Sequence, residues 1–204
     1  MKIICIGRNY VDHARELNNP VPENPVFFLK PDTALLRRNR PFYYPDFSDD
    51  IHYECELVVK INKLGKNIQE KFAHTYYSEI GIGIDFTARD LQGKAKAKGL
   101  PWEIAKAFDN SAPLSMEFID KNLLGDLKNI SFRLDRNGET VQQGNSGDMI
   151  FDFDDLIVYT SKFLTLKTGD LIYTGTPAGV GPVKIGDLLE AYIGDQLMLR
   201  CRVK

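Results

Sequence analysis

The stretch HYECELVVKI (52–61) decides the fold class, because apolar and polar residues alternate along it. Side chains of a β-strand point alternately to its two faces, so this pattern predicts a strand with the odd-numbered residues 53–61 on one apolar face. Glu54 and Glu56 then project together from the opposite face, with His52 beside them. We therefore expect a sheet whose one face is buried and whose other face carries two carboxylates.

Two explanations fit the pair of glutamates. The strand can present its polar face to water, as many antiparallel strands do. However, carboxylates that share a face repel each other, and a bound cation relieves that repulsion. The spacing of two residues lets both side chains reach one ion, although this spacing alone is a weak signal.

A third carboxylate, Asp85, follows the run Gly81–Ile84, in which glycines at alternate positions indicate close approach by neighbouring groups. Asp85 precedes a predicted helix, so helix capping is the alternative explanation for it. Thr87 and Asp90, however, form a capping-box pattern of their own, which leaves Asp85 free. Two glutamates and one aspartate make an all-oxygen site suited to Mg²⁺ or Mn²⁺.

Outside this region, predicted strands outnumber predicted helices. The asparagine–glycine pair at 137–138 is typical of a type I′ hairpin turn between two of these strands. We expect strands at 1–7, 26–29, 80–85, 130–134, 139–143, 171–173 and 188–193, and helices at 10–17, 72–79, 87–98 and 155–164. Since the two kinds of element do not alternate regularly, the pattern predicts an α+β fold with a rolled or barrel-like sheet rather than a Rossmann-type sheet.

The composition is that of an ordinary globular protein. The chain has 204 residues, 43% of them hydrophobic, and a formal net charge of -2, which disfavours a nucleic-acid binder. No apolar run approaches the roughly 18 residues of a membrane helix, and residues 1–7 lack a signal-peptide cleavage pattern, so we expect no membrane partner. The three cysteines are far apart and are interpreted as buried thiols in a reducing compartment, here the cytoplasm. With only three histidines, carboxylates are the candidate metal ligands.

His13 and Glu16 are candidates for acid–base chemistry. On a helix they are i,i+3 neighbours, and a carboxylate beside an imidazole orients the ring and stabilises its charged form. A surface ion pair is the alternative, since such pairs are common on helices. The loop at 18–25 is rich in proline and asparagine, and with this helix it suggests a lid that closes over a site.

Two further segments are candidate substrate contacts. Arg89, Gln92 and Lys106 follow Asp85 and would suit an anionic substrate, although lysines on helices are usually just solvated. The glycine-rich segment at 174–182 lacks the Gly-Lys-Ser/Thr ending of a phosphate loop. Its backbone either cradles a carboxylate or is only a tight connection.

Six segments, taken together and in order, resemble the fumarylacetoacetate hydrolase family, and in particular its short acylpyruvase and oxaloacetate decarboxylase members. They are GRNYVDHAREL (7–17), ECEL (54–57), DFTARDLQ (85–92), KGLPWEIAKAFDNSAP (98–113), GNSGDMIF (144–151) and TGDLIYTGTPAGVGPV (168–183). Two small departures, Cys55 between the glutamates and Ser146-Gly147, remove no functional group.

The resemblance implies a mixed β-roll or β-sandwich with few peripheral helices, present as a homodimer, with residues 1–204 as one catalytic domain and 10–25 as its lid. It implies metal ligation by Glu54, Glu56 and Asp85, and a water-activating dyad of His13 and Glu16. It also places four residues at the substrate: Arg89, Gln92, Lys106 and Thr176, of which Lys106 adds catalytic positive charge.

The activity implied by the resemblance is cleavage of the C3–C4 bond of β-keto acids through a pyruvate enolate held on Mg²⁺ or Mn²⁺. Acylpyruvates would be hydrolysed and oxaloacetate would be decarboxylated. Isomerisation, tautomerisation or hydration of oxo- or hydroxy-diene dioates on the same site is the alternative, and a non-catalytic binding protein is a further one. The sequence leaves the oxo-acid and the choice between the two metals open.

Overall fold

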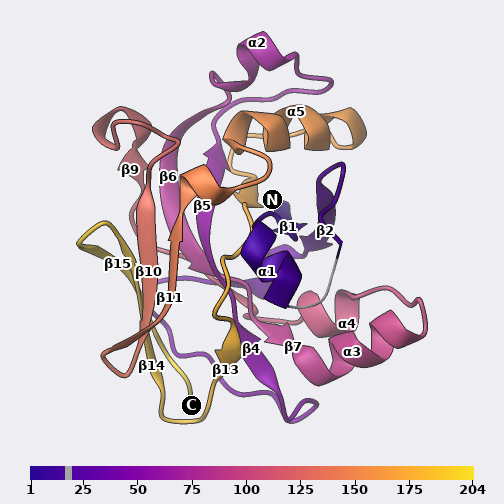
Figure 1. Cartoon of the computed structure of the whole chain (residues 1–204), viewed down its shortest axis with the longest axis vertical. Helices are drawn as coiled ribbons and strands as arrows, with labels where there is room; N and C mark the ends of the chain where they lie inside the picture. The colour runs from indigo at the N-terminus through magenta and orange to yellow at the C-terminus, as the bar shows by residue number, and fades with distance from the viewer. Residues whose placement is uncertain (17–19) are drawn as a thin grey trace.

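The strand predicted at 52–61 is two strands that belong to different sheets (Figure 1). The structure is a computed structural model that describes residues 1–16 and 20–204. In it β4 (Ile51–Tyr53) ends before Glu54 and β5 (Cys55–Ile61) begins after it. The chain therefore passes from one sheet to another at Glu54, which a simple alternating pattern does not reveal.

Four sheets make up most of the molecule, and each is described by its strand order. The six-stranded sheet has the order β2 (Val26–Lys30), β1 (Ile3–Gly7), β12 (Leu171–Tyr173), β5, β6 (Tyr77–Ile84) and β9 (Ile119–Asp120). The four-stranded sheet has the order β11 (Glu139–Asn145), β10 (Ser131–Arg136), β14 (Leu188–Ile193) and β15 (Gln196–Arg202). The smaller sheets are β13 (Gly181–Pro182), β4 and β7 (Thr87–Ala88), and the pair β3 (Leu35–Leu36) and β8 (Ala112–Pro113).

The helices are short and lie around the sheets (Figure 1). They are α1 (Val11–Glu16), α2 (Glu70–Ala73), α3 (Arg89–Ala97), α4 (Glu103–Lys106) and α5 (Phe153–Phe163), with 3₁₀ turns at Asp32–Ala34, Lys121–Leu123 and Ser146–Asp148. In Figure 1, α5 crosses the top of the sheets next to α2, whereas α3 and α4 lie together at the lower right. Residues 17–19, on which parts of the predicted helix and lid fall, lie outside the described residues.

The main core lies between the six-stranded and four-stranded sheets. Side chains from β5 and β6 share one buried cluster with side chains from β10, β14 and β15. The odd-numbered residues 53–61 all belong to this cluster, which confirms the predicted apolar face. The three cysteines are buried and free, as predicted, and burial raises the pKa of the Cys201 thiol to about 12.

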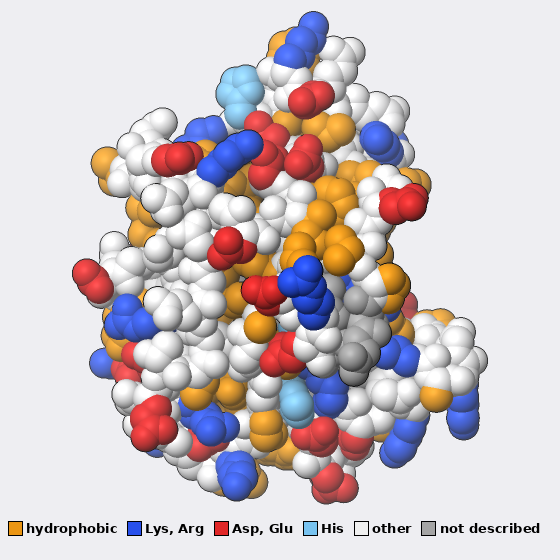
Figure 2. All heavy atoms as spheres, in the orientation of Figure 1, with side chains coloured by type: hydrophobic (Ala, Val, Ile, Leu, Met, Phe, Trp, Pro, Cys, Tyr) orange, Lys and Arg blue, Asp and Glu red, His pale blue; other side chains and the backbone are white. Residues whose placement is uncertain are grey.

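The predicted fold class is confirmed: the protein is α+β, mostly sheet, with few peripheral helices. The hairpin prediction is also confirmed, since Asn137 and Gly138 both have positive φ angles between β10 and β11. The face shown in Figure 2 carries positive and negative side chains interspersed, in agreement with a net charge near zero. In the described part of the chain, no helix is long and apolar enough to cross a membrane.

The helix predicted at 72–79 is wrong. Only Glu70–Ala73 is helical, and β6 begins at Tyr77. Tyr77 pairs with Ile61 across the sheet and its ring lies 6.0 Å from that of Phe153 in the core. Strand pairing and aromatic packing therefore decide this segment, and both depend on residues far away in the sequence.

Candidate active site

Glu54 and Asp85 come together because two neighbouring strands change sheets at the same level. Cys55 pairs with Ile84 in the six-stranded sheet, and the chains continue into β4 and β7, which pair in the three-stranded sheet. Between these pairings, the backbone N–H of Asp85 donates a hydrogen bond of 2.8 Å to the carbonyl oxygen of Glu54. The two carboxylates therefore leave adjacent strands at one junction.

Glu56 completes a group of three buried carboxylates. It lies opposite Gly83 on the β5–β6 ladder, two residues beyond the junction. One oxygen from each of Glu54, Glu56 and Asp85 can be chosen so that all three lie within 4.8 Å of one another. The glycine prediction is confirmed as well, because a Cβ added to Gly83 would lie 2.5 Å from the ring of Tyr173.

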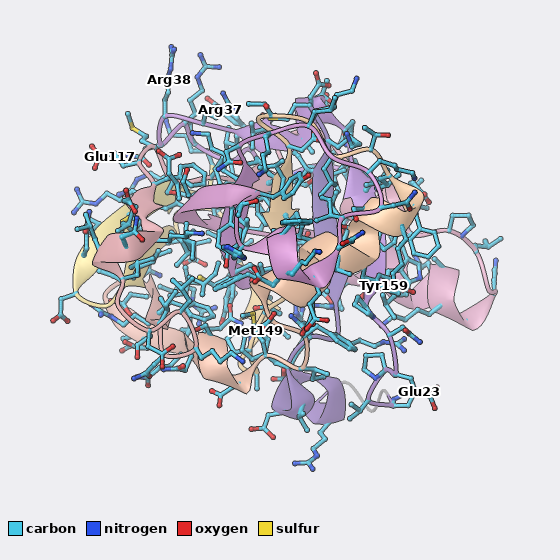
Figure 3. The ribbon with its side chains drawn as sticks, turned by 90° about the horizontal axis from the view of Figure 1, so that it is seen from above. Glu23, Arg37, Arg38, Glu117, Met149 and Tyr159 are labelled. Carbon is cyan, nitrogen blue, oxygen red and sulfur yellow. The ribbon has the colours of Figure 1, made fainter. Side chains whose placement is uncertain are left out.

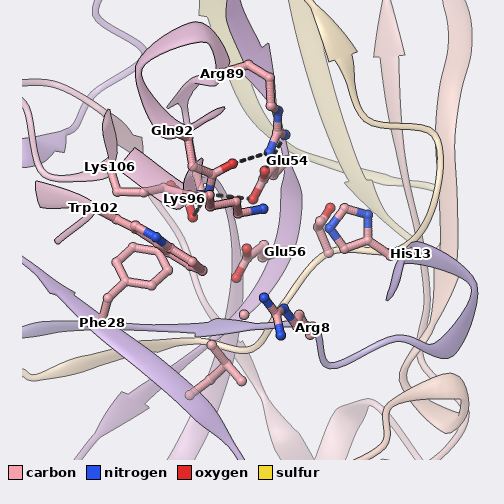
Figure 4. A pocket seen from close by; sticks show the side chains of 14 residues that line it. Arg8, His13, Phe28, Glu54, Glu56, Arg89, Gln92, Lys96, Trp102 and Lys106 are labelled. Atoms are coloured by element: carbon pink, nitrogen blue, oxygen red, sulfur yellow. Dashed lines mark hydrogen bonds and ion pairs between the residues drawn. The ribbon is translucent and has the colours of Figure 1, made fainter. Parts of the chain in front are cut away.

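Cations of the chain neutralise two of the three carboxylates (Figure 4). The ammonium group of Lys106 lies 2.8 Å from Oε2 of Glu54 and 2.8 Å from Oδ2 of Asp85. The guanidinium of Arg89 lies 2.6 Å from Oε1 of Glu54. Glu56 instead accepts a hydrogen bond of 2.8 Å from the backbone N–H of Gly175, and no described lysine or arginine lies within 4 Å of it.

The pKa shifts follow from this arrangement. Burial acts to raise the pKa of Glu54, but the charges of Lys106 and Arg89 outweigh burial and hold that pKa below its ordinary value. Burial raises the pKa of Glu56 well above its ordinary value, and the charges of Asp85 and Glu54 raise it further. Glu56 is therefore the carboxylate that gains most from an added positive charge.

The three carboxylates fit a hard divalent cation. All three are buried, all offer oxygen, and they converge on one point. In addition, Oδ1 of Asp85 accepts no hydrogen bond from the described residues, although the ammonium of Lys30 lies 2.8 Å away. Mg²⁺ and Mn²⁺ are the ions this oxygen-only donor set suits.

Lys30, at the end of β2, is a site residue that the sequence did not reveal. Its side chain is fully buried, and besides Asp85 it donates to Oγ of Ser111 at 2.8 Å and to the carbonyl oxygens of Phe86 and Lys106. It therefore ties the Asp85 carboxylate to the backbone around α4. A lysine that ends an otherwise apolar strand, just before a proline, is the only signal the sequence offered.

His13 and Glu16 lie on α1 at the same pocket. Nδ1 of His13 lies 3.1 Å from Oε2 of Glu16, and the other Glu16 oxygen accepts a hydrogen bond of 3.1 Å from the N–H of Gly179. His13 is buried and lines the pocket together with the three carboxylates. The pair is thus not the exposed ion pair that spacing alone allowed.

The glycine-rich segment at 174–182 cradles carboxylates, but they belong to the chain itself. Its N–H groups at Gly175 and Gly179 donate to Glu56 and Glu16 respectively. Thr176 is buried at the pocket, where its hydroxyl donates to the carbonyl oxygen of Cys55 at 2.9 Å. This segment therefore links the acidic cluster to the His13–Glu16 pair.

Arg89 and Gln92 lie in the first turn of α3 and both line the pocket. Nη1 of Arg89 donates to Oε1 of Gln92 at 2.8 Å, so the two side chains hold each other in place. Of the nine predicted site residues, eight line this one pocket and the ninth, Glu16, is bonded to His13.

Two smaller expectations are wrong. Thr87 does not cap α3: it pairs with His52 as part of β7, and its hydroxyl receives the ammonium of Lys106. The helix begins at Arg89, after Ala88, without a side-chain cap. His52 does not join the two glutamates, because its Nε2 lies 2.9 Å from Oδ1 of Asp50 instead.

This fold and this acidic pocket are those of a known class. The family model described as fumarylacetoacetate (FAA) hydrolase C-terminal matches residues 2–204, and the chain belongs to this family. The resemblance of the six sequence segments is thereby confirmed.

Individual relatives cover nearly the whole chain. It is 46% identical over 193 residues to "Oxaloacetate decarboxylase, mitochondrial" of Dictyostelium discoideum, covering 94% of this chain and 88% of that protein. It is 45% identical over 200 residues to "Oxaloacetate tautomerase YcgM" of Escherichia coli strain K12, covering 98% and 91%. A crystal structure of fumarylpyruvate hydrolase from Pseudomonas aeruginosa in complex with Mn²⁺ and pyruvate superposes with a TM-score of 0.93 at 36% identity, covering 100% and 89%.

Proposed function

We propose that the protein is a divalent-metal-dependent enzyme that cleaves the C3–C4 bond of β-keto acids, by acylpyruvate hydrolysis, oxaloacetate decarboxylation or both. The observation that carries this proposal is the convergence of three buried carboxylates and a His–Glu pair on one pocket. The relatives named for oxaloacetate and fumarylpyruvate support the same substrate class.

Glu54, Glu56 and Asp85 would hold the cation, Mg²⁺ or Mn²⁺. When bound, it supplies a Lewis acid that stabilises negative charge developing on substrate oxygen. The complex of the Pseudomonas aeruginosa relative with Mn²⁺ and pyruvate supports a cation and a 2-oxo acid in this class of site.

Lys106 and Arg89 serve the charge that appears when the C3–C4 bond breaks. The electron pair of that bond stays on C3 and delocalises onto the 2-oxygen as an enolate, and protonation at C3 then yields pyruvate. Both cations line the pocket, and buried positive groups aimed at a developing oxyanion are worth more than the same groups in water. This requirement is common to hydrolysis and decarboxylation.

His13 and Glu16 serve hydrolysis alone. With Nδ1 turned toward Glu16, Nε2 of His13 is left to take a proton from water. The hydroxide formed attacks the distal carbonyl carbon of an acylpyruvate, and the acyl group leaves as a carboxylic acid. Oxaloacetate loses this carbon as CO₂, so no water attacks.

The remaining features belong to the same proposal. Residues 1–204 act as one catalytic domain, and 10–25 act as a lid whose closed position is held by the Glu16–Gly179 hydrogen bond. A second copy would cover exposed apolar side chains such as Ile104 and Phe163, giving a homodimer that light scattering can test. The free, buried thiols agree with a cytoplasmic location.

Tautomerisation is the second candidate, because the Escherichia coli relative is named an oxaloacetate tautomerase. In that reaction a proton moves between C3 and the 2-oxygen and no carbon–carbon bond breaks. The same pocket would hold the enol, and His13 would carry the proton.

One substrate panel tests both candidates. Acetylpyruvate, oxaloacetate and a 2-hydroxy-diene dioate are assayed with Mg²⁺ and after chelation by EDTA, with pyruvate release and keto–enol absorbance followed separately. We expect Mg²⁺-dependent pyruvate release from at least one β-keto acid. Fast keto–enol exchange without pyruvate release would favour tautomerisation, and no reaction on any substrate would contradict both.

A further inference from the structure

Arg8 occupies a backbone conformation that side chains other than glycine rarely adopt. Its φ angle is +61°, in the left-handed region, between the end of β1 and the start of α1. Non-glycine residues persist there only where the surrounding structure holds them, and such residues cluster at functional sites.

Asn9 is what holds this conformation. It is fully buried, and its side chain donates to the carbonyl oxygens of Thr174 and Phe151 at 2.7 and 3.0 Å and accepts from the N–H of Phe151 at 2.9 Å. With Asn9 fixed by three hydrogen bonds and Gly7 in the sheet, the backbone of Arg8 has little freedom. The result is that the Arg8 guanidinium faces the pocket near Glu56 (Figure 4).

Arg8 and Lys96 differ from the other cations of this pocket. Arg89 and Lys106 each form ion pairs of 2.6–2.8 Å with the acidic cluster. Neither Arg8 nor Lys96 forms an ion pair within 4 Å, or donates a side-chain hydrogen bond, in the described part of the chain. Lys96 lies over the ring of Trp102, 5.3 Å from its centroid.

These two cations are also close enough to interact. Burial lowers the pKa of Lys96, and the charges of Arg89 and Arg8 lower it further. Positive groups that repel each other at a pocket, without carboxylates of their own, are suited to a bound anion.

We propose that Arg8, with Lys96, binds the second carboxylate of the substrate, so that the enzyme prefers dicarboxylic 2-oxo acids to monocarboxylic acylpyruvates. This inference rests on the proposed function and adds the substrate class. A guanidinium matches a carboxylate with two parallel hydrogen bonds, which an ammonium group cannot reproduce. The strained backbone of Arg8 is then retained because it aims this group into the pocket.

Kinetics on a matched substrate pair test the proposal. For Arg8→Gln we expect kcat/KM on oxaloacetate to fall about 10–100-fold, the usual effect of losing a hydrogen-bonded charge, and kcat/KM on acetylpyruvate to change less than about 3-fold. Arg8→Lys should recover part of the oxaloacetate activity. Equal losses on the two substrates would overturn the proposal.

Arg38 provides a matched control. It has the same left-handed conformation, with φ of +64°, but its side chain is exposed and projects from the surface in Figure 3. Arg38→Gln should leave both substrates unaffected. If it lowered oxaloacetate turnover as much as Arg8→Gln does, the effect would be one of general charge and the proposal would fail.

Binding without turnover separates this proposal from the proposed function. 2-Oxoglutarate and 2-oxovalerate have the same 2-oxo acid end and chain length, and only the first has a second carboxylate. In Mg²⁺, calorimetry should show tighter binding of 2-oxoglutarate to the wild type and similar affinities in Arg8→Gln. Equal affinities in the wild type would overturn the role of Arg8 alone, whereas no binding of either compound and no turnover of any β-keto acid would overturn the proposed function as well.

Arg8→Gly separates function from structure. Glycine adopts a positive φ without strain, so we expect the melting temperature to stay the same or rise while the preference for oxaloacetate is lost. A melting temperature lowered by several degrees would show that Arg8 is kept for stability and would contradict the proposal.

Discussion

The ammonium group of Lys106 lies 2.8 Å from Oδ2 of Asp85, and so a cation of the chain stands within the acidic cluster. The same group is 2.8 Å from Glu54, but Glu56 has only a backbone N–H as its partner. The three carboxylates are therefore not equivalent. Glu56 is the one whose charge is least compensated.

Binding of Mg²⁺ should release a proton from Glu56. Because burial and the charges of Asp85 and Glu54 raise the pKa of Glu56, the metal-free protein keeps this carboxyl protonated above its ordinary range. Affinity for Mg²⁺ should rise with pH through that raised pKa, while the stability of the metal-free protein should fall over the same interval. Calorimetry in two buffers of different ionisation enthalpy measures the released proton, and identical heats in the two buffers would contradict the prediction.

Glu56→Gln should weaken the metal site without unfolding the protein. The substitution keeps the size of the side chain but removes one charged oxygen, so Mg²⁺ affinity should fall and activity should recover partly at high Mg²⁺. Glu79→Gln, on β6 but partly exposed and paired with Lys60, is the control and should bind Mg²⁺ as the wild type does. Full activity of Glu56→Gln after exhaustive chelation would refute the metal assignment.

Gly83→Ala should destabilise the protein by about 1–3 kcal/mol through overpacking, because the new methyl group would lie 2.5 Å from the buried ring of Tyr173. Gly93→Ala is the matched control: it lies in α3 with open space around its Cβ position and should stabilise by about 0.5–1 kcal/mol. Chemical denaturation measures both. Equal stabilities would mean that the space beside Gly83 is not needed.

The sequence predicted the acidic cluster because its signals are local. The spacing of Glu54 and Glu56 and the glycines before Asp85 are visible in short segments, and the apolar face at 53–61 follows from a period of two. The break at Glu54 was missed since both halves of the segment alternate in the same way. Only the partners of each half, β13 and β7 on one side and β12 and β6 on the other, show that the chain changes sheets.

The missed residues owe their roles to distant contacts. Lys30 reads as the polar end of a strand, and its value comes from Asp85 and Ser111, which lie 55 and 81 positions further along the chain. Arg8 reads as a turn residue, and its direction depends on hydrogen bonds that Asn9 makes with Phe151 and Thr174. Thr87 was predicted to cap a helix because its local pattern does not reveal that it pairs with His52.

The proposed lid should respond to a substrate mimic. Oxalate resembles the pyruvate enolate, and in the presence of Mg²⁺ it should slow hydrogen exchange in the segment 10–25, where His13 and Glu16 face the pocket. The strand β15, remote in sequence and part of the four-stranded sheet, serves as the internal control. Unchanged protection of the segment with and without oxalate would count against closure.

The central claim is that His13 and Glu16 activate water while Lys106 stabilises the enolate that both reactions share. Steady-state kinetics of His13→Ala and Lys106→Met on acetylpyruvate and oxaloacetate at saturating Mg²⁺ test it most directly. His13→Ala should slow acetylpyruvate hydrolysis by about 10²–10⁴-fold, the usual effect of losing a general base, and oxaloacetate decarboxylation far less, whereas Lys106→Met should slow both. If His13→Ala slows the two substrates by the same factor, the pair does not serve water activation and the account is contradicted.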